Sequence, residues 1–157
     1  MSAVSYRLAG ESDVFALAAN RWSFRVEEDG EPAGIDPEAF RRHCEAFLRS
    51  ALASGRWAFW VAEAGGRLVG NAFVQVVPKV PRPGRFDDAI GYLTNVYVEP
   101  ELRARGVGTG LVEHALEWAR ARDLELLFVW PSERSRPLYG RAGFHPGEVQ
   151  ELVLRPE

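Results

Sequence analysis

The sequence predicts a mixed α/β fold, in which a mixed β-sheet carries helices on both faces. Two patterns support this class. β-rich runs alternate with amphipathic, helix-like runs, and a Gly-Gly pair joins two of the β-rich runs as a hairpin. Of the 157 residues, 46% are hydrophobic and 26% are charged, an ordinary balance for a compact domain with a sizeable core. We therefore expect residues 1–157 to form a single domain.

Two helices are predicted ahead of the main strands. Val4–Leu8 is typical of a short first strand, and Ser12 is a candidate N-cap of a helix that ends at about Trp22 or slightly beyond it. Asp36-Pro37-Glu38 indicates the start of the second helix, because it combines a capping carboxylate with a proline in the first turn. Apolar residues then recur at helical spacing on one face: Phe40, Cys44, Phe47, Leu48, Ala51 and Leu52.

The stretch between these helices is acidic. Six carboxylates follow one another without an intervening basic residue: Glu27, Glu28, Asp29, Glu31, Asp36 and Glu38. Glycine and proline lie among them, so we expect a solvated loop. The alternative interpretation is a surface that attracts a cationic substrate.

Three strands are predicted after the second helix. Gly65-Gly66 separates Trp57–Ala62 from Leu68–Val77, which indicates a hairpin. After a proline-rich turn, Ile90–Val98 is the next strand, and Pro100 ends its hydrogen-bonding ladder. The third strand therefore stops directly before a glycine-rich loop.

The last part of the chain alternates in type. A third helix closes near residues 120–122, and its apolar face is marked by Val107, Leu111, Val112, Ala115, Leu116 and Ala119. Leu124–Trp130 is a predicted strand, Pro137–Ala142 a short helix ended by Gly143, and Val149–Leu154 a last strand.

Composition argues against several classes of function. The formal net charge of −3 lacks the basic excess of a nucleic-acid-binding domain. No apolar run approaches the roughly 18 residues that cross a bilayer, and Met1–Arg7 shows no secretory signal. Cys44 is the single cysteine, and the three histidines have no metal-ligand spacing. We expect a cytoplasmic protein without a metal, a nucleic-acid partner or a membrane partner.

The segment Arg103–Gly110 carries the strongest functional signal. It contains two arginines and three glycines where a strand passes into a helix. Amide groups at a helix N-terminus lack intrahelical acceptors and lie at the positive end of the dipole, so they suit a bound phosphate. Glycines let the backbone approach the phosphate closely. We interpret the loop as the pyrophosphate site of a coenzyme.

Three motifs together resemble the GNAT superfamily of N-acetyltransferases. Arg103–Gly108 matches that family's acyl-CoA signature, which is Arg or Gln, two variable residues, Gly, one variable residue, and Gly or Ala. Asn95–Pro100 resembles its fourth strand, and Leu138–Phe144 resembles its Leu-Tyr, three-residue spacer, Gly-Phe element. The resemblance implies a mostly antiparallel central sheet whose fourth and fifth strands splay apart.

The resemblance also implies roles for named residues. It implies that acetyl-CoA is the co-substrate, that its pantetheine arm pairs with the splayed strand, and that an amide near Val96 or Tyr97 polarises the thioester carbonyl. Ser132 stands where many relatives have Asn, so we expect that coenzyme contact from Ser132 or Ser135. The coenzyme-binding residues implied are Val96, Tyr97, Val98, Arg103, Ala104, Arg105, Gly106, Val107, Gly108, Thr109, Ser132 and Ser135.

Tyr139 is the implied catalytic acid. A phenol with a pKa near 10 is protonated at neutral pH and can protonate the leaving CoA thiolate. The alternative is a purely structural tyrosine that packs in the core. The base that deprotonates the acceptor, a primary amine, is not identified by the sequence: the candidates are Thr94, Asn95, Asp87, Asp88, Glu99 and Glu101. The sheet edges left by the splay favour a homodimer.

Rival interpretations of the glycine loop fit less well. A Walker A loop needs a Gly-Lys pair that this loop lacks, and a dinucleotide fingerprint needs glycine where Leu111 stands. A different class of function remains open, namely a non-catalytic acyl-CoA sensor, which would keep the loop and need no acid.

Overall fold

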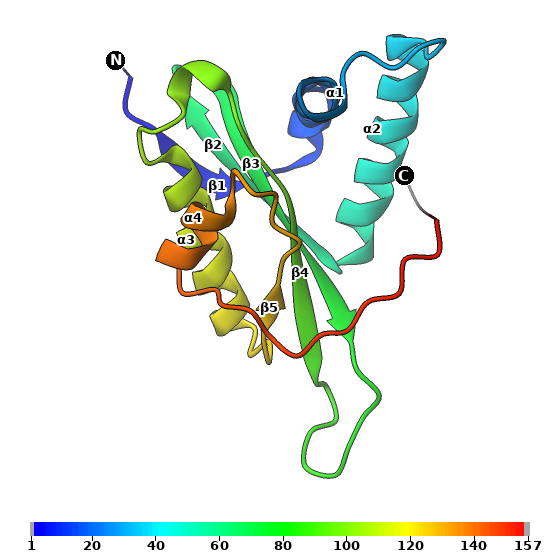
Figure 1. The fold of residues 1–157 in the computed structure, drawn as a ribbon, viewed down its shortest axis with the longest axis vertical. Coiled ribbons are helices and arrows are strands. Elements are labelled where there is room, and N and C mark those ends of the chain that lie inside the picture. The colour runs from blue at the N-terminus through cyan, green and yellow to red at the C-terminus, as the bar shows by residue number, and fades with distance from the viewer. Residues whose placement is uncertain (1, 156–157) are drawn as a thin grey trace.

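The computed structural model describes residues 2–155 and contains one five-stranded sheet in the order β1-β2-β3-β4-β5 (Figure 1). The strands are β1 (Ser5–Leu8), β2 (Trp57–Ala64), β3 (Arg67–Pro78), β4 (Ala89–Val98) and β5 (Leu127–Phe128). The first four strands pair antiparallel, and β5 pairs with β4 in parallel. The predicted mixed, mostly antiparallel class is confirmed.

Helices α1 (Val14–Asp29) and α2 (Pro37–Ser54) cover one face of the sheet. Val14, Leu17 and Leu48 pack there against Phe59 and Phe73, and all five side chains are buried. The Asp36 carboxylate caps α2 as predicted, because it accepts hydrogen bonds from two backbone amides of the first turn.

Helix α1 is longer than predicted. The sequence placed its end near Trp22, but the helix continues to Asp29 and stops at Gly30, whose φ of 81° is left-handed. The i,i+4 ion pair of Arg25 with Asp29 stabilises the added turns. Ser12 is not the N-cap either, since it lies in a 3-10 turn that precedes the helix. The first three carboxylates of the acidic stretch are therefore helical, and the prediction of a loop for them was wrong.

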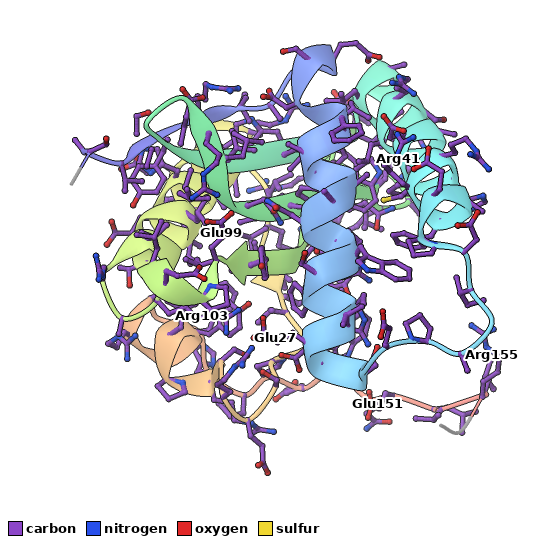
Figure 2. All side chains as sticks on the ribbon, turned by 90° about the horizontal axis from the view of Figure 1, so that it is seen from above. Glu27, Arg41, Glu99, Arg103, Glu151 and Arg155 are labelled. Carbon is purple, nitrogen blue, oxygen red and sulfur yellow. The ribbon has the colours of Figure 1, made fainter. Side chains whose placement is uncertain are left out.

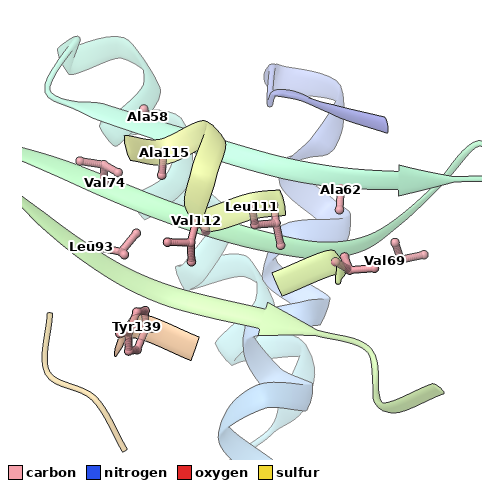
Figure 3. Close-up of a cluster of buried hydrophobic side chains, with 11 residues drawn as sticks. Ala58, Ala62, Val69, Val74, Leu93, Leu111, Val112, Ala115 and Tyr139 are labelled. Carbon is pink, nitrogen blue, oxygen red and sulfur yellow. The ribbon is translucent and has the colours of Figure 1, made fainter. Parts of the chain in front are cut away.

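Helices α3 (Val107–Ala121) and α4 (Arg136–Arg141) cover the opposite face. Leu111 and Val112 of α3 are fully buried against Val74 and Leu93 of the sheet, and Tyr139 of α4 joins the same cluster (Figure 3). The hydrophobic core thus lies on both sides of β2 and β3. None of the helices within residues 2–155 is long and apolar enough to span a bilayer.

The end of the chain departs from the prediction. Within Leu124–Trp130 only Leu127 and Phe128 form a strand, paired with Gly91 and Tyr92, while β4 continues to Val98, so the two strands separate as the resemblance implied. Val149–Leu154 is not a strand: Leu152 and Leu154 are 82% and 83% exposed, and the segment crosses the molecule as an extended tail (Figure 1). Alternating apolar residues form a strand only where a neighbouring strand accepts their hydrogen bonds.

Candidate active site

A β-bulge in β4 marks the centre of the candidate site. Phe73 of β3 pairs with Thr94, whereas Asn71 pairs with Tyr97, so β4 contains one extra residue between these pairs. Asn95 lies in the bulge with a left-handed φ of 53°. Bulges turn backbone groups away from the regular ladder, which makes them available to a ligand.

One buried side chain and two partly buried ones hold this bulge in place. The Nδ2 of Asn71, whose side chain is fully buried, donates to the carbonyl of Asn95 at 2.7 Å. Its Oδ1 accepts from the Nδ2 of Asn20 at 3.1 Å, and the Nη1 of Arg21 donates to the Oδ1 of Asn95 at 3.2 Å. Helix α1 therefore contacts the bulge both directly and through β3.

A pocket of about 280 Å³, here called the tyrosine pocket, lies between β4, the diverging end of β5 and helix α1. Its lining residues are Arg21, Phe24, Arg25, Glu28, Tyr92, Leu93, Thr94, Asn95, Val96, Val129, Trp130, Ser132, Arg134, Ser135 and Tyr139.

A second pocket of about 420 Å³, the glycine-loop pocket, adjoins the first. Its lining residues are Phe24, Glu27, Val96, Tyr97, Val98, Arg103, Ala104, Gly106, Gly108, Thr109, Arg134, Ser135, Leu138 and Arg141. The two pockets share Phe24, Val96, Arg134 and Ser135, so they meet at the bulge.

The glycine loop has the geometry of an anion site. Ala104 and Gly106 both have left-handed φ values, of 59° and 84°. The amide of Gly110 is the first to bond back into the helix, to the carbonyl of Gly106 at 3.0 Å. The amides of Val107, Gly108 and Thr109 come earlier in the helix and have no acceptor within it. Loop amides of this kind form a concave site for oxyanions.

The predicted coenzyme residues are divided between the two pockets. Nine of the twelve line the glycine-loop pocket, namely Val96, Tyr97, Val98, Arg103, Ala104, Gly106, Gly108, Thr109 and Ser135. Ser132 lines the tyrosine pocket, where its hydroxyl accepts from the amide of Ser135 at 3.3 Å. The Val107 side chain is in the core, and the Arg105 side chain is exposed and lines neither pocket.

Arg103 is already paired within the protein. Its guanidinium donates to the Val98 carbonyl at 2.9 Å and forms a bidentate ion pair with Glu27 of α1 (Figure 2). Arg134 also contacts Glu27, at 3.2 Å, and Glu28, at 2.7 Å. The Arg103 hydrogen bond holds the pKa of the Glu27 carboxyl below its usual range. These two carboxylates are therefore neutralised by arginines, which argues against the acidic stretch as a site for a cation.

Tyr139 is buried beside the bulge. Its residue is 7% exposed, its ring packs against Phe144 with centroids 5.6 Å apart, and it lines the tyrosine pocket. Burial, with a smaller contribution from Tyr92, raises the pKa of Tyr139 to about 12. The phenol is therefore firmly protonated at neutral pH and lies where a proton donor could act.

The candidate bases lie in different places. Thr94 and Asn95 line the tyrosine pocket, whereas none of the four candidate carboxylates lines either pocket. Glu99 pairs with Arg67, and Asp88 lies at the opposite end of β4 near Lys79.

Sequence reasoning missed one wall of the site. Arg21 and Arg25 line the tyrosine pocket because α1 continues past Trp22 and packs beside β4. Trp130 was also missed as a site residue, although it is the last residue of a predicted strand. A helical reading of residues 22–29 would have placed Arg21 and Arg25 on one side of the helix, since i and i+4 share a face.

The fold and the site together define an α/β domain with a bulged strand between two joined pockets, one of which has a glycine-rich anion loop. The sequence profile of the Acetyltransferase (GNAT) family matches residues 19–144, and the chain belongs to this family.

Known proteins resemble parts or all of the chain. It is 35% identical over 85 residues to glucosamine 6-phosphate N-acetyltransferase of Trypanosoma brucei brucei, which is 54% of this chain and 56% of that protein. It is 28% identical to the probable N-acetyltransferase camello of Xenopus tropicalis, over 97% of this chain and 66% of that protein. The alignments span between 30% and 66% of the length of the curated relatives.

Solved structures match over almost the whole chain. A predicted acetyltransferase of Clostridium acetobutylicum, crystallised with acetyl-CoA, is 25% identical with a TM-score of 0.79, over 97% of both chains. A GCN5-related N-acetyltransferase of Ralstonia eutropha is 27% identical with a TM-score of 0.75, over 96% of this chain and 99% of that chain.

Proposed function

We propose that this chain is an acetyl-CoA-dependent N-acetyltransferase that transfers the acetyl group directly to a primary amine in a ternary complex. The observation that carries the proposal is the β4 bulge at the junction of two pockets, because it gives each substrate its own site and a common meeting point. Family membership and the acetyl-CoA in a structural neighbour support it.

The glycine-loop pocket is proposed to bind the coenzyme. The orphan amides of Val107, Gly108 and Thr109 suit its pyrophosphate, and β4 residues 96–98 line the same pocket, where the pantetheine arm would lie along them. An amide of the bulge, at Val96 or Tyr97, would polarise the thioester carbonyl and stabilise the oxyanion formed on attack.

The tyrosine pocket is proposed to hold the acceptor and the acid. The amine nitrogen forms a bond to the carbonyl carbon, the carbon–sulfur bond breaks, and the thiolate receives the proton of the Tyr139 hydroxyl. The nitrogen loses a proton as it becomes an amide, and that proton restores the Tyr139 hydroxyl. The burial that raises the pKa of Tyr139 keeps its hydroxyl protonated, so the proton is available when the thiolate forms. A water held by Thr94 and Asn95 would accept the proton that the ammonium loses before attack.

A covalent acyl-enzyme is not needed. The one cysteine, Cys44, lies on α2 and lines neither pocket. Burial raises the pKa of its thiol, which makes it a poor nucleophile.

Thiol release measured over a panel of primary amines tests the proposal. We expect wild type to release CoA with at least one amine, and Tyr139→Phe to lower kcat by about 10²-fold or more, the usual contribution of a general acid. Calorimetry should give nearly the same acetyl-CoA Kd for both proteins. Tight acetyl-CoA binding without turnover on any amine would instead favour a non-catalytic sensor.

Finer properties are proposed as well. We infer a single-domain cytoplasmic protein from the composition, and a homodimer that covers the strand edges left where β4 and β5 separate. Light scattering at several concentrations tests the dimer, and a monomer mass throughout would contradict it.

A further inference from the structure

The wall of the tyrosine pocket carries more positive than negative charge. Three arginines and one carboxylate line it: Arg21, Arg25, Arg134 and Glu28. A pocket that receives only a cationic amine would be expected to show the opposite balance. This excess indicates that the acceptor brings negative charge of its own.

Two of the three arginines already have carboxylate partners. Arg25 pairs with Asp29, and Arg134 pairs with Glu27 and Glu28. Arg21 differs: within residues 2–155, none of the ion pairs involves it, and its hydrogen bond is to the neutral side-chain amide of Asn95. A guanidinium has several N–H donors, so most of its capacity remains for a ligand.

Arg21 is also placed in surroundings that disfavour its charge. Burial, followed by the like charge of Arg25, lowers the pKa of Arg21 from its usual range. The ring of Phe24 lies 5.8 Å from its guanidinium carbon, and this cation–π contact compensates only part of the lost hydration. An anion bound at this point would compensate the desolvated charge, and a charge-assisted bond there would be stronger than one at the surface.

We propose that Arg21 binds an oxyanion of the acceptor, so that the second substrate is an amine that also carries a carboxylate or a phosphate group. The inference rests on the proposed function, because it concerns the second substrate of that reaction. Arg21 contacts Asn95, the residue before Val96, so an oxyanion held there would orient the amine beside the bulge where the thioester carbonyl is expected.

The opposite wall suits the body of such a molecule. Tyr92 and Phe128 stack with centroids 5.0 Å apart, and Trp130 meets Tyr92 edge-on at 5.0 Å. Trp130 is 60% exposed, so part of its ring remains available for contact. The oxyanion of the acceptor would then contact Arg21, its apolar body would contact Trp130, and its amine would lie beside the bulge.

Matched pairs of amines test the inference. One arm compares glucosamine 6-phosphate with glucosamine, and the other compares amino acids with their amides. The members of each pair differ in the anionic group. The amine of an amino-acid amide is less basic than that of the amino acid, so more of it is unprotonated and reactive, and a preference for the anionic member cannot come from amine basicity. We expect wild type to show a kcat/KM at least about 10-fold higher for the anionic member of one pair, and the arm that responds identifies phosphate or carboxylate.

Arg21→Gln and Arg21→Lys separate recognition from a structural role. We expect the anionic-to-neutral ratio of kcat/KM to fall toward unity in Arg21→Gln and to be partly retained in Arg21→Lys, which keeps the charge. If Arg21 were only structural, its replacement would lower kcat/KM equally for the anionic and the neutral amine, and the ratio would stay unchanged. Arg42→Gln, at an arginine whose side chain is 62% exposed on α2, is the matched control and should keep the wild-type ratio.

The outcomes distinguish the two proposals. Wild type that acetylates neutral amines as well as their anionic partners would overturn this inference and leave the proposed function standing. Acetyl-CoA binding without acetylation of any amine would overturn the proposed function, and the inference with it.

Discussion

Asn71 contacts the bulge of β4 through a fully buried side-chain amide. Both ends of that amide are used, one to donate to the Asn95 carbonyl and one to accept from Asn20. Buried polar groups that lose a partner cost more than exposed ones, because water cannot replace the bond. The position of the backbone at the candidate reaction centre therefore depends on one side chain that lines neither pocket.

We expect Asn71→Ala to lower the free energy of unfolding by about 1–3 kcal/mol, measured by urea denaturation, because it leaves the Asn95 carbonyl without its donor. The variant should also lower kcat, since the bulge is free to shift. Asn20→Ala is the control. Asn20 is only partly buried, so a water molecule can replace its hydrogen bond to Asn71, and the free energy of unfolding should fall by less. Equal losses in both variants would contradict the role given to the Asn95 bond.

Tyr139 gives a prediction on pH. Its pKa of about 12 in the folded protein exceeds the value of about 10 expected when unfolded, so the folded state keeps a proton that the unfolded state releases. Stability contributed by this group is therefore present below about pH 10 and declines as pH rises toward 12. Thermal unfolding between pH 9 and pH 11 should show a shallower decline for Tyr139→Phe than for wild type. Identical slopes would contradict the raised pKa.

At the scale of elements, the packing of helix α3 depends on Gly110, a glycine that lines neither pocket. A Cβ on Gly110 would lie 2.2 Å from the hydroxyl oxygen of Tyr6 and 2.3 Å from the ring carbon that carries it. The Tyr6 ring stacks on His114 with centroids 4.7 Å apart, so it has little freedom to move. Gly110 therefore allows α3 to pack closely over β1.

We expect Gly110→Ala to destabilise the protein by about 1–3 kcal/mol, as overpacking of a filled interior usually does. The same substitution at Gly108, two residues earlier, would place its Cβ no closer than 3.6 Å to a neighbour. Gly108→Ala should therefore leave the melting temperature unchanged or raise it, because alanine favours a helix by about 1 kcal/mol over glycine. A lower melting temperature for Gly108→Ala than for Gly110→Ala would refute this assignment.

The elements that could be predicted are those with local signals. The second helix was predicted at its start because Asp36 caps it and Pro37 fits its first turn, and the glycine loop was predicted because its residues are contiguous. The end of α1 was missed because its run of acidic residues is typical of a loop. In the structure Asp29 pairs with Arg25 and Glu27 pairs with Arg103, and the second pairing joins residues far apart in the sequence. The strand predicted at Val149–Leu154 failed because strand formation needs a partner that local sequence does not specify.

The candidate site follows the same division. Residues of the glycine loop and β4 were predicted from motifs, whereas Arg21 and Phe24 enter the site only because α1 packs beside the bulge. That packing joins residues far apart in the chain, and no short pattern encodes it.

At the scale of the whole molecule, the ion pair between Glu27 and Arg103 connects the end of α1 to the glycine loop (Figure 2). It joins residues 76 apart in the sequence at the edge of the glycine-loop pocket. The Glu27 carboxylate accepts hydrogen bonds from the Arg103 guanidinium and places negative charge where an anionic coenzyme is proposed to bind.

We expect Glu27→Gln to bind acetyl-CoA several-fold more tightly, because it releases Arg103 and removes a repelling charge. Calorimetry at low and moderate salt measures the effect, which should shrink as salt increases. Glu31→Gln, an exposed position beyond α1, makes the same change in net charge and should leave the Kd unaltered. Unchanged or weaker binding by Glu27→Gln would contradict the competition.

The two pockets share four residues and otherwise have separate linings. An occupant of one leaves most of the other uncovered, so the proposed reaction would let either reactant bind first and either product leave first. Steady-state kinetics of such an enzyme give intersecting initial-velocity lines, and a CoA analogue that cannot react competes with the coenzyme alone.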